Sequence, residues 1–330
     1  MDNFSALVVN KTDDRFTVAV QPLTEKDLPN GDILVRVSYS SINFKDGLAA
    51  NENGNIVRSY PFVPGIDLAG TVVTSSDARF SEGDEVLVTG YDLGVSHYGG
   101  YSEYAKVPAE WVVALPKGLT MKEAMAFGTA GFTAALSIHR LEENGLTPEK
   151  GPVLVTGATG GVGSLAVSML AKKGYHVVAS TGKQSAHEYL KAIGAKEIID
   201  REELTPEKIP ALNKQNWAGA VDPVGGKTLA YVLSSMKYGG SVAVSGLTGG
   251  TNVPTKVFPF ILRGINLLGI DSVFCPMELR MKLWDKMASE FKPESLLADI
   301  GQEISLDALP AVLPEILKGT VKGRTIVKVK

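Results

Sequence analysis

The stretch Val153–Gly163, which reads VLVTGATGGVG, decides the fold. Its apolar start is typical of a buried strand, and apolar residues recur at helical spacing from its end: Val162, Leu165, Ala166, Met169 and Leu170. The glycines between strand and helix let the backbone approach a pyrophosphate, whose charge the helix N-terminus favours. We therefore assign phosphate binding to Gly160, Gly161 and Gly163. Ala158 stands where the strict fingerprint has its first glycine, so a tight turn without a ligand stays an alternative.

Further apolar strands follow in the second half of the chain, each separated from the next by a helical pattern. They are expected at residues 176–180, 198–199, 220–222 and 242–245. Continuous apolar strands that alternate with amphipathic helices indicate a parallel sheet covered on both faces. This part of the chain is therefore predicted to be a Rossmann-type, doubly wound α/β fold.

The first 120 residues show a different sequence pattern, in which short strands are separated by turns rich in proline and glycine. Strands are expected at residues 6–10, 33–40, 69–74, 85–89 and 101–107. A helix near residues 277–291 and a strand at residues 325–329 follow the Rossmann pattern, and an inserted domain needs its host chain to continue afterwards. We predict a Rossmann NADP-binding domain at residues 122–274, inserted into a mostly β substrate domain formed by residues 1–121 and 275–330.

Composition excludes several classes of protein. The 330 residues carry a net charge of −3, which offers no general attraction to nucleic acid or to an anionic membrane. No apolar run approaches the roughly 18 residues of a membrane span, and the N-terminal residues do not resemble a signal peptide, so a cytoplasmic protein is expected. Cys275 is the single cysteine, which excludes intrachain disulfides and a multi-thiolate zinc site.

The segment after the second Rossmann strand indicates which nucleotide is used. NAD-binding versions place an acidic residue there, where it bonds the ribose hydroxyls and repels a 2′-phosphate. Here Thr181, Gly182 and Lys183 follow the strand, and no acid comes before Glu188. A hydroxyl and a cation suit a phosphate, and Arg201 can add a second cation, so NADPH is predicted as cofactor. The alternative is that Lys183 and Arg201 are solvated loop charges.

No zinc site is expected, because the four histidines, His97, His139, His176 and His187, lie far apart in the chain. Without a Lewis acid, a conjugated acceptor is easier to reduce than an isolated ketone, since its developing negative charge is spread over an extended system. We therefore expect reduction of a quinone, an enone or an α,β-unsaturated thioester.

Several segments, in order along nearly the whole chain, resemble the zinc-free quinone oxidoreductase branch of the medium-chain dehydrogenase/reductase superfamily. They are Asn43–Asp46 (NFKD), Val63–Asp67 (VPGID), Gly99–Tyr104 (GGYSEY), Gly128–Thr133 (GTAGFT) and Asp222–Gly226 (DPVGG). Others resemble the YhdH/YhfP group, which includes acrylyl-CoA reductases: Ser41–Ala49 (SINFKDGLA), His187–Leu190 (HEYL), Phe260–Gly264 (FILRG) and Leu268–Ser272 (LGIDS).

This resemblance implies a GroES-like substrate domain, NADPH as hydride donor, and a cleft between the domains where nicotinamide and substrate meet. It implies catalytic roles for Asn43 and Asp46. It also implies cofactor contacts by Phe44, Thr129, Thr159, Gly160, Gly161, Val162, Thr181, Gly182, Lys183, Arg201, Leu247, Ser272 and Arg324.

This chain departs from the pattern of close relatives at two places. Close relatives often have Ser-Gly-Arg where this chain has Thr181-Gly182-Lys183, and tyrosine where it has Phe44. Lysine keeps the charge without the bidentate fork of arginine, which weakens the expected NADP preference. For Asn43 and Asp46 the alternative is that they cap a turn before Gly47.

The predicted reaction is hydride transfer from NADPH to a short enoyl-CoA such as acrylyl-CoA, for which Arg58, Lys256 and Arg263 are candidate phosphate contacts. One alternative is an NADPH-dependent quinone oxidoreductase. Another is a redox sensor that binds NADPH without catalysis. The segment Ile265–Ile270 is an expected strand whose edge can pair across a two-fold axis, and the alternative is an internal strand covered by its own helices. The family resemblance implies a homodimer.

Overall fold

The computed structural model describes residues 3–330, and the chain divides into two compact units. Unit 1 comprises Met1–Thr129, Val273–Ala288 and Leu296–Lys330, and unit 2 comprises Ala130–Ser272 and Ser289–Ser295. The domain limits after residues 121 and 274 remain predictions, since units defined by contacts are not the limits of an inserted domain. Among the described residues, no helix has the length and apolar character that a membrane span requires.

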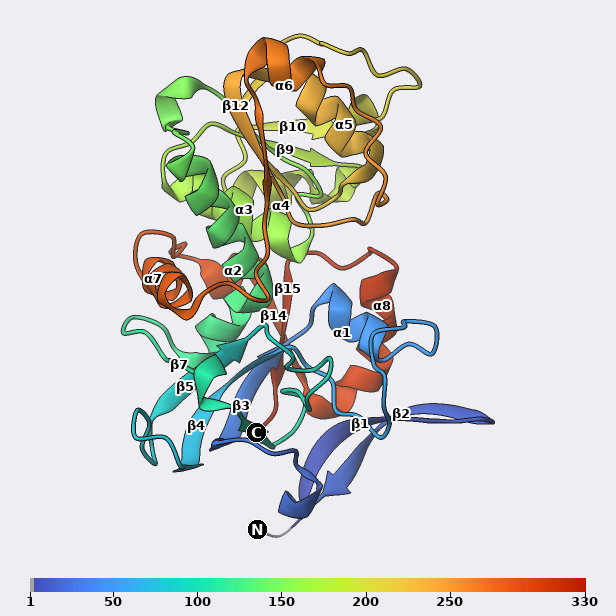
Figure 1. The fold of residues 1–330 in the computed structure, drawn as a ribbon, viewed down its shortest axis with the longest axis vertical. Helices are drawn as coiled ribbons and strands as arrows, with labels where there is room; N and C mark the ends of the chain where they lie inside the picture. The colour runs from blue at the N-terminus through green and yellow to red at the C-terminus, as the bar shows by residue number, and fades with distance from the viewer. Residues whose placement is uncertain (1–2) are drawn as a thin grey trace. The chain divides into compact units, whose positions relative to one another are not determined.

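Unit 2 contains a six-stranded sheet in the order β10-β9-β8-β11-β12-β13, in which all neighbouring strands are parallel (Figure 1). The strands are β8 (Val153–Val155), β9 (Val177–Thr181), β10 (Glu197–Asp200), β11 (Trp217–Asp222), β12 (Met236–Val244) and β13 (Asn266–Gly269). The chain runs outward from β8 on one side and then from β11 on the other, which is the doubly wound order. The predicted Rossmann fold is confirmed.

The helices of unit 2 are α3 (Gly161–Lys172), α4 (His187–Ala192), α5 (Gly226–Ser234) and α6 (Phe258–Arg263). Helix α3 packs against β8, β9 and β11, while α5 and α6 pack against β12. All residues of β8, β9 and β11 are buried, which is why these strands read as continuous apolar runs. By contrast β13 forms an edge of the sheet, and its residues are mostly exposed.

Unit 1 is mostly β, as predicted. A seven-stranded sheet contains β14 (Gly301–Ser305), β15 (Arg324–Lys328), β3 (Ile33–Ser41), β4 (Asp67–Ser75), β5 (Glu85–Thr89), β7 (Val113–Ala114) and β6 (Tyr104–Val107). A separate antiparallel pair joins β1 (Phe4–Thr12) to β2 (Arg15–Leu23). The helices are α1 (Phe44–Ala49), α7 (Met277–Met287) and α8 (Leu309–Leu317). The C-terminal strand β15 pairs with β3, so the chain returns to its first part.

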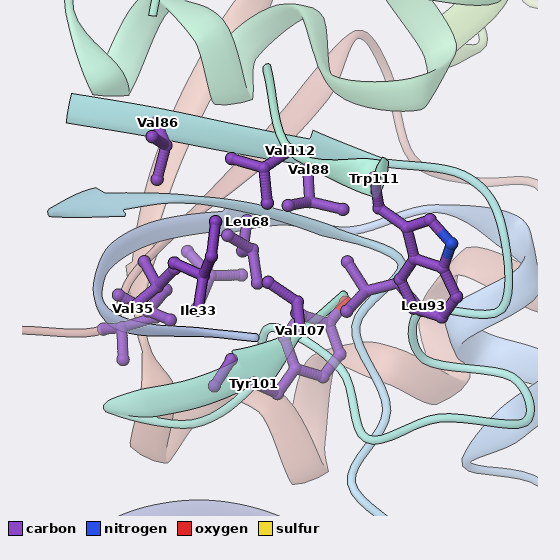
Figure 2. Packing of buried hydrophobic residues seen from close by; sticks show 14 of the residues in the cluster. Ile33, Val35, Leu68, Val86, Val88, Leu93, Tyr101, Val107, Trp111 and Val112 are labelled. Carbon is purple, nitrogen blue, oxygen red and sulfur yellow. The ribbon is translucent and has the colours of Figure 1, made fainter. Parts of the chain in front are cut away.

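Apolar side chains from this sheet and its loops form the core of unit 1 (Figure 2). Ile33, Leu68, Leu93 and Val107 are completely buried there. Tyr101 is also completely buried, and β6 begins only at Tyr104, three residues after the predicted start of that strand. The reason is that the backbone here has other partners, since the Tyr101 nitrogen donates to the Pro64 carbonyl oxygen at 3.1 Å and Ser102 forms an isolated bridge with Ala6. The Tyr101 hydroxyl donates a hydrogen bond to the carbonyl oxygen of Ser41 at 3.1 Å.

The long helix α2 (Met121–Glu143) is interrupted at Gly128, where the backbone has φ +52° and ψ −158°. A side chain at this position would also collide with its surroundings, because a Cβ would lie 2.4 Å from Oδ2 of Asp67. Thr129 comes directly after this break. The sequence pattern did not reveal this break.

Candidate active site

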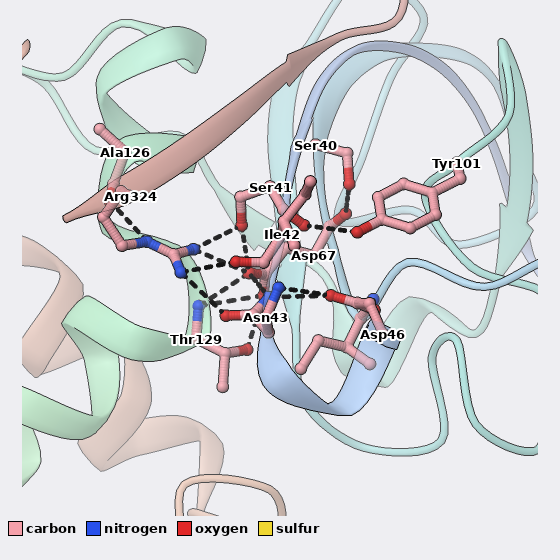
Figure 3. A network of polar contacts seen from close by, with 11 residues as sticks. Ser40, Ser41, Ile42, Asn43, Asp46, Asp67, Tyr101, Ala126, Thr129 and Arg324 are labelled. Carbon is pink, nitrogen blue, oxygen red and sulfur yellow. Dashed lines mark hydrogen bonds and ion pairs between the residues drawn. The ribbon is translucent and has the colours of Figure 1, made fainter. Parts of the chain in front are cut away.

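Unit 1 buries a group of polar and charged side chains beside the break in α2 (Figure 3). We call it the Asp67 cluster and define it as Ser41, Asn43, Asp46, Asp67, Thr129 and Arg324. Its members come from β3, the start of α1, β4, α2 and β15. Of the residues that the sequence assigned to the site, the cluster unites Asn43, Asp46, Thr129 and Arg324.

Asp67 is the centre of this cluster and is completely buried. Its Oδ2 accepts hydrogen bonds from Ser41 Oγ at 2.6 Å and from Asn43 Nδ2 at 2.7 Å. Its Oδ1 accepts from the Thr129 hydroxyl at 2.6 Å, and both oxygens lie 3.0 Å from the Thr129 backbone nitrogen. Four donor groups therefore converge on this one carboxyl group.

Arg324 supplies the positive charge of the cluster and is only 2% exposed. Its Nη2 lies 3.8 Å from Asp67 Oδ2 and donates to Ser41 Oγ at 2.7 Å. Its remaining N–H groups donate to Asn43 Oδ1 at 3.2 Å and to the carbonyl oxygens of Ile42 and Ala126 at 2.8 and 3.2 Å. These contacts tie β15 to the start of α1 and to α2.

Asn43 and Asp46 together cap helix α1. The Asp46 carboxylate accepts from the backbone nitrogens of Asn43 at 2.8 Å and of Ile66 at 2.9 Å, and Asn43 is the N-cap residue. The capping alternative for this pair is therefore confirmed, while their catalytic roles stay predictions. The Asn43 amide directs one N–H to Asp67 and the other to Asp46, the latter at the longer distance of 3.3 Å.

Burial changes the acid–base properties of these groups. Burial and the nearby charge of Asp67 raise the pKa of Asp46 to about 7, although the backbone N–H groups of Ile66 and Asn43 oppose this shift. Burial also raises the pKa of Tyr101 well above its ordinary value. It lowers the pKa of Arg324, against the opposite effect of Asp67 and Asp46.

A second group of predicted residues lies at the carboxyl edge of the sheet in unit 2, between β8 and α3. Gly157 has a φ of +54°, and Gly160 is the N-cap residue of α3. A Cβ at Gly163 would lie 2.3 Å from the Gly157 carbonyl oxygen, so only glycine lets α3 pack this closely on the turn. The residues predicted to hold the pyrophosphate lie in this turn or at the start of α3, where a phosphate-binding loop requires them: Thr159, Gly160, Gly161 and Val162.

The neighbouring strand end is braced by a buried carboxyl group. Asp222 ends β11 and accepts hydrogen bonds from the Thr156 hydroxyl and, at 2.8 Å, from the Gly225 backbone nitrogen. Burial raises its pKa. Ser245, one residue after β12, has a buried hydroxyl group with no hydrogen-bond partner among the described residues. An orphaned hydroxyl at this edge is a free contact for a ligand.

Two cations meet beyond the end of β9. Asp200 pairs with Thr181 in the parallel register of β10 and β9, so Arg201 and Gly182 are the next residues of the two strands. A Cβ at Gly182 would lie 2.5 Å from Nε of Arg201, which shows that the arginine side chain passes over this glycine. The charge of Arg201 adds to burial in lowering the pKa of Lys183. This edge therefore concentrates positive charge.

The remaining predicted residues occupy exposed or partly exposed positions. Phe44 is 44% exposed at the start of α1. Leu247 is 62% exposed in the loop after β12, and Ser272, which follows β13, accepts a hydrogen bond from Thr133 at 2.9 Å. Sequence reasoning missed Ser41, Asp67 and Ser245. Asp67 lies in the VPGID segment that was noted, but only the tertiary structure shows its contacts.

Two further points concern ligand chemistry. Arg263 donates to the carbonyl oxygens of Asn213, Ser234 and Met236, so this candidate contact for a CoA phosphate is engaged in unit 2. Among residues 3–330, no group of three or more histidine, cysteine or acidic side chains is arranged to hold a metal ion.

Comparisons with known proteins fit both parts of the chain. Residues 29–117 match the alcohol dehydrogenase GroES-like domain family, and residues 161–289 match the zinc-binding dehydrogenase family. The chain is 60% identical to the putative quinone oxidoreductase YhfP of Bacillus subtilis, covering 98% of each sequence. It is 50% identical to the acrylyl-CoA reductase AcuI of Ruegeria pomeroyi, covering 99% of each.

Solved structures agree with these relatives. The structure of B. subtilis YhfP with NAD bound superposes with a TM-score of 0.97 at 59% identity, covering 100% of both chains. The yhdH oxidoreductase from Salmonella enterica in complex with NADP gives a TM-score of 0.96 at 48% identity, covering 99% of this chain and 100% of that one. The two relatives thus hold different nucleotides.

Proposed function

The chain belongs to the medium-chain dehydrogenase/reductase superfamily, in its YhfP/YhdH acrylyl-CoA reductase group, and we propose that it reduces a short α,β-unsaturated acyl-CoA with NADPH. Membership makes it an NAD(P)-dependent reductase of the acrylyl-CoA reductase or quinone oxidoreductase type. The alternative of a non-catalytic redox sensor is left without support. Acrylyl-CoA is the proposed substrate because AcuI, at 50% identity over nearly the full length, is an acrylyl-CoA reductase.

The observation that carries the nucleotide part of the proposal is the carboxyl edge of the sheet in unit 2. Gly157 and Gly163 shape a turn that a larger residue would block, and the orphaned Ser245 hydroxyl offers an additional polar contact. A dinucleotide fits these residues, with its pyrophosphate on Thr159, Gly160, Gly161 and Val162. When bound, NADPH supplies the hydride that the β-carbon of the substrate receives.

The preference for NADPH rests on Lys183 and Arg201. Asp200 and Glu203, which lie near Arg201 in the sequence, form a capping box in which they accept hydrogen bonds from backbone nitrogens. Two cations side by side favour a group with two negative charges, such as the 2′-phosphate of NADP. The NAD found in the YhfP structure nevertheless calls for a direct comparison of the two nucleotides.

We propose a reaction that does not use zinc, although one matching family is described as zinc-binding. The donor set of the Asp67 cluster does not fit this metal, because an amide, two hydroxyls and the Arg324 guanidinium surround the carboxylate. Asn43 is proposed to act on the enolate through the N–H that now makes the longer contact with Asp46. Asp46 itself is a proposed proton donor, since its pKa of about 7 leaves part of it protonated at neutral pH.

The proposal is tested by following NADPH oxidation with acrylyl-CoA and, at matched concentration, with a 1,4-quinone. We expect kcat/KM for the thioester to exceed that for the quinone by about 100-fold. The reverse ratio would make quinone reduction the principal activity, a second candidate favoured by the similarity to YhfP. Silence with both acceptors despite NADPH binding would refute both.

A homodimer is proposed from the exposed edge of the unit 2 sheet. Among residues 3–330 no strand pairs with the outer edge of β13, and the adjoining helix α6 exposes Ile261 and Leu262 at 69% and 56%. An unpaired edge beside apolar side chains is a suitable surface for a second copy. Sedimentation of the purified protein tests this, with a dimer expected for the natural chain and a monomer for Ile261→Asp. A monomeric natural chain would refute the proposal.

A further inference from the structure

A cavity of about 390 Å³ lies in unit 2 at the amino edge of the sheet. The residues that line it come from the segment between α2 and β8 and from the first parts of β11 and β12. All strands of a parallel sheet begin at the same edge, so this cavity and the glycine turn after β8 lie at opposite ends of the strands. The volume is within the range of small-molecule sites, about 300–1,000 Å³.

A bulge in β12 forms one wall of this cavity. Two neighbouring pairs of the β11 and β12 ladder enclose only Ala218 on β11 but residues 237–240 on β12. The backbone of this segment turns at Gly239, which has a φ of +70°. Bulges interrupt regular pairing and redirect side chains, and they are frequent beside functional sites. The departure from regular pairing therefore coincides with the lining of the cavity.

The bulge carries an aromatic side chain that is largely exposed to solvent. Tyr238 lines the cavity and is 79% exposed. Its backbone nitrogen donates a hydrogen bond to Oε1 of Gln215 at 2.9 Å, which fixes the backbone of the bulge at this point. A tyrosine ring has a flat apolar face on which another ring can stack, and aromatic side chains are common in the lining of ligand sites.

Two lysines line the same cavity. The Lys237 ammonium donates a hydrogen bond to the carbonyl oxygen of Lys150 at 3.3 Å, so the two residues are in direct contact. The Lys237 ammonium lies over Gly151, where a Cβ would come within 2.3 Å of it. The Lys150 ammonium lies over Gly145, 3.3 Å from the position of a Cβ. An ammonium group has three N–H donors, so Lys237 retains donors for a ligand.

The charge of the lining is positive, because none of the described residues that line the cavity is acidic. The acidic residues closest in sequence have contacts of their own. Glu142 lies 2.9 Å from Nζ of Lys173 and accepts a hydrogen bond from the Tyr175 hydroxyl at 3.0 Å. A hydrogen bond from the Thr147 side chain lowers the pKa of Glu149. An anion in the cavity would be attracted by both lysines and could accept charge-assisted hydrogen bonds from them.

We propose that this cavity binds a small organic anion that carries an aromatic ring, with the anionic group at Lys150 and Lys237 and the ring against Tyr238. The site is separate from the nucleotide site, because it lies at the other end of the strands. A phosphate or carboxylate attached to a ring supplies both features, whereas inorganic phosphate supplies only the charge. The proposal does not depend on which acceptor the reductase uses.

Calorimetric titration of the protein saturated with NADPH tests the site, with phenyl phosphate as the probe. The nucleotide occupies its own site in this experiment, so the probe cannot bind there. We expect one phenyl phosphate per chain, with a dissociation constant below about 1 mM. Inorganic phosphate should bind about fivefold more weakly, because it lacks the ring. Absence of saturable binding, or binding that occurs only without NADPH, would overturn the proposal.

Three variants locate the bound probe. We expect Lys237→Met to weaken phenyl phosphate binding by about tenfold through the loss of a charge-assisted hydrogen bond, and Tyr238→Ala to weaken it by about fivefold. Lys214→Met is the matched control, since Lys214 is exposed and lies outside the lining. The affinity for NADPH should stay the same in all three variants. Equal phenyl phosphate affinities of Lys237→Met and Lys214→Met would refute the site, as would a parallel loss of NADPH affinity in Lys237→Met.

Discussion

The carboxyl edge of the unit 2 sheet and the Asp67 cluster of unit 1 are both rich in charge, but they are built in opposite ways. Arg201 is exposed and Ser245 has an orphaned hydroxyl, so the sheet edge keeps polar groups available. In the cluster, Asp67 and Arg324 are buried, and their polar atoms are hydrogen-bonded to neighbouring residues. The first arrangement is suited to binding a charged ligand, and the second to holding side chains in fixed directions.

The largest expected effect follows from removing a cation at each place. Arg324→Met leaves the buried Asp67 carboxylate without its partner, which costs about 3–5 kcal/mol of unfolding free energy. Arg201→Met, the matched control, removes an exposed charge and changes stability by less than about 0.5 kcal/mol. Urea unfolding of both variants checks this, and equal losses of stability would contradict the contrast between the two regions.

A second prediction concerns the nucleotide. Replacing Lys183 by methionine removes one of the two cations at the sheet edge, and we expect the NADPH dissociation constant to rise about 10-fold to 100-fold. NADH, which has no 2′-phosphate, should bind as before. Titration with both nucleotides measures the ratio, and a parallel loss for NADH would mean that Lys183 does not recognise the phosphate.

Asn43→Ala distinguishes a catalytic role from a structural one. Loss of the buried Asn43 amide, whose Nδ2 donates to Asp67 at 2.7 Å, should lower the unfolding free energy by about 1–3 kcal/mol. Turnover should fall by a larger factor than NADPH affinity, because the amide is proposed to act on the enolate. Steady-state kinetics and nucleotide titration test this on the same preparation, and unchanged kcat would remove Asn43 from the catalytic residues.

A further expected effect is a pH dependence of the unfolding free energy due to Asp46. Its pKa is about 7 in the folded protein and about 4 in an unfolded chain, so the folded state binds more protons between these values. Its contribution to stability is therefore complete below about pH 4 and is lost as the pH rises toward 7, with a slope of at most about 1.4 kcal/mol per pH unit.

The side chain in Asp46→Asn cannot titrate, so the unfolding free energy of this variant should lack the slope. Outside the range between these two pH values it should differ from that of the natural protein by a constant offset. Urea unfolding between these pH values provides the measurement. Identical slopes in the two proteins would show that Asp46 is ionised throughout the range, and it would then be unsuitable as a proton donor.

Local patterns explain what could be predicted from the sequence. The turn at Val153–Gly163 and the alternation of strands and helices depend on neighbours along the chain, and the Rossmann fold follows from them. The Asp67 cluster depends on β3, β4, α2 and β15, which are distant in sequence. Neither the break at Gly128 nor the burial of Tyr101 leaves a periodic signal, because each is caused by tertiary contacts.

The parallel register between β9 and β10 has an evolutionary consequence. Arg201 reaches Gly182 only because Asp200 stands opposite Thr181, although 18 residues separate the two positions. Deleting one residue from β10 itself would shift this register and turn the arginine to the other face of the sheet. If Arg201 contacts the 2′-phosphate as proposed, such a deletion would alter the coenzyme preference even though every charged residue of the chain is retained.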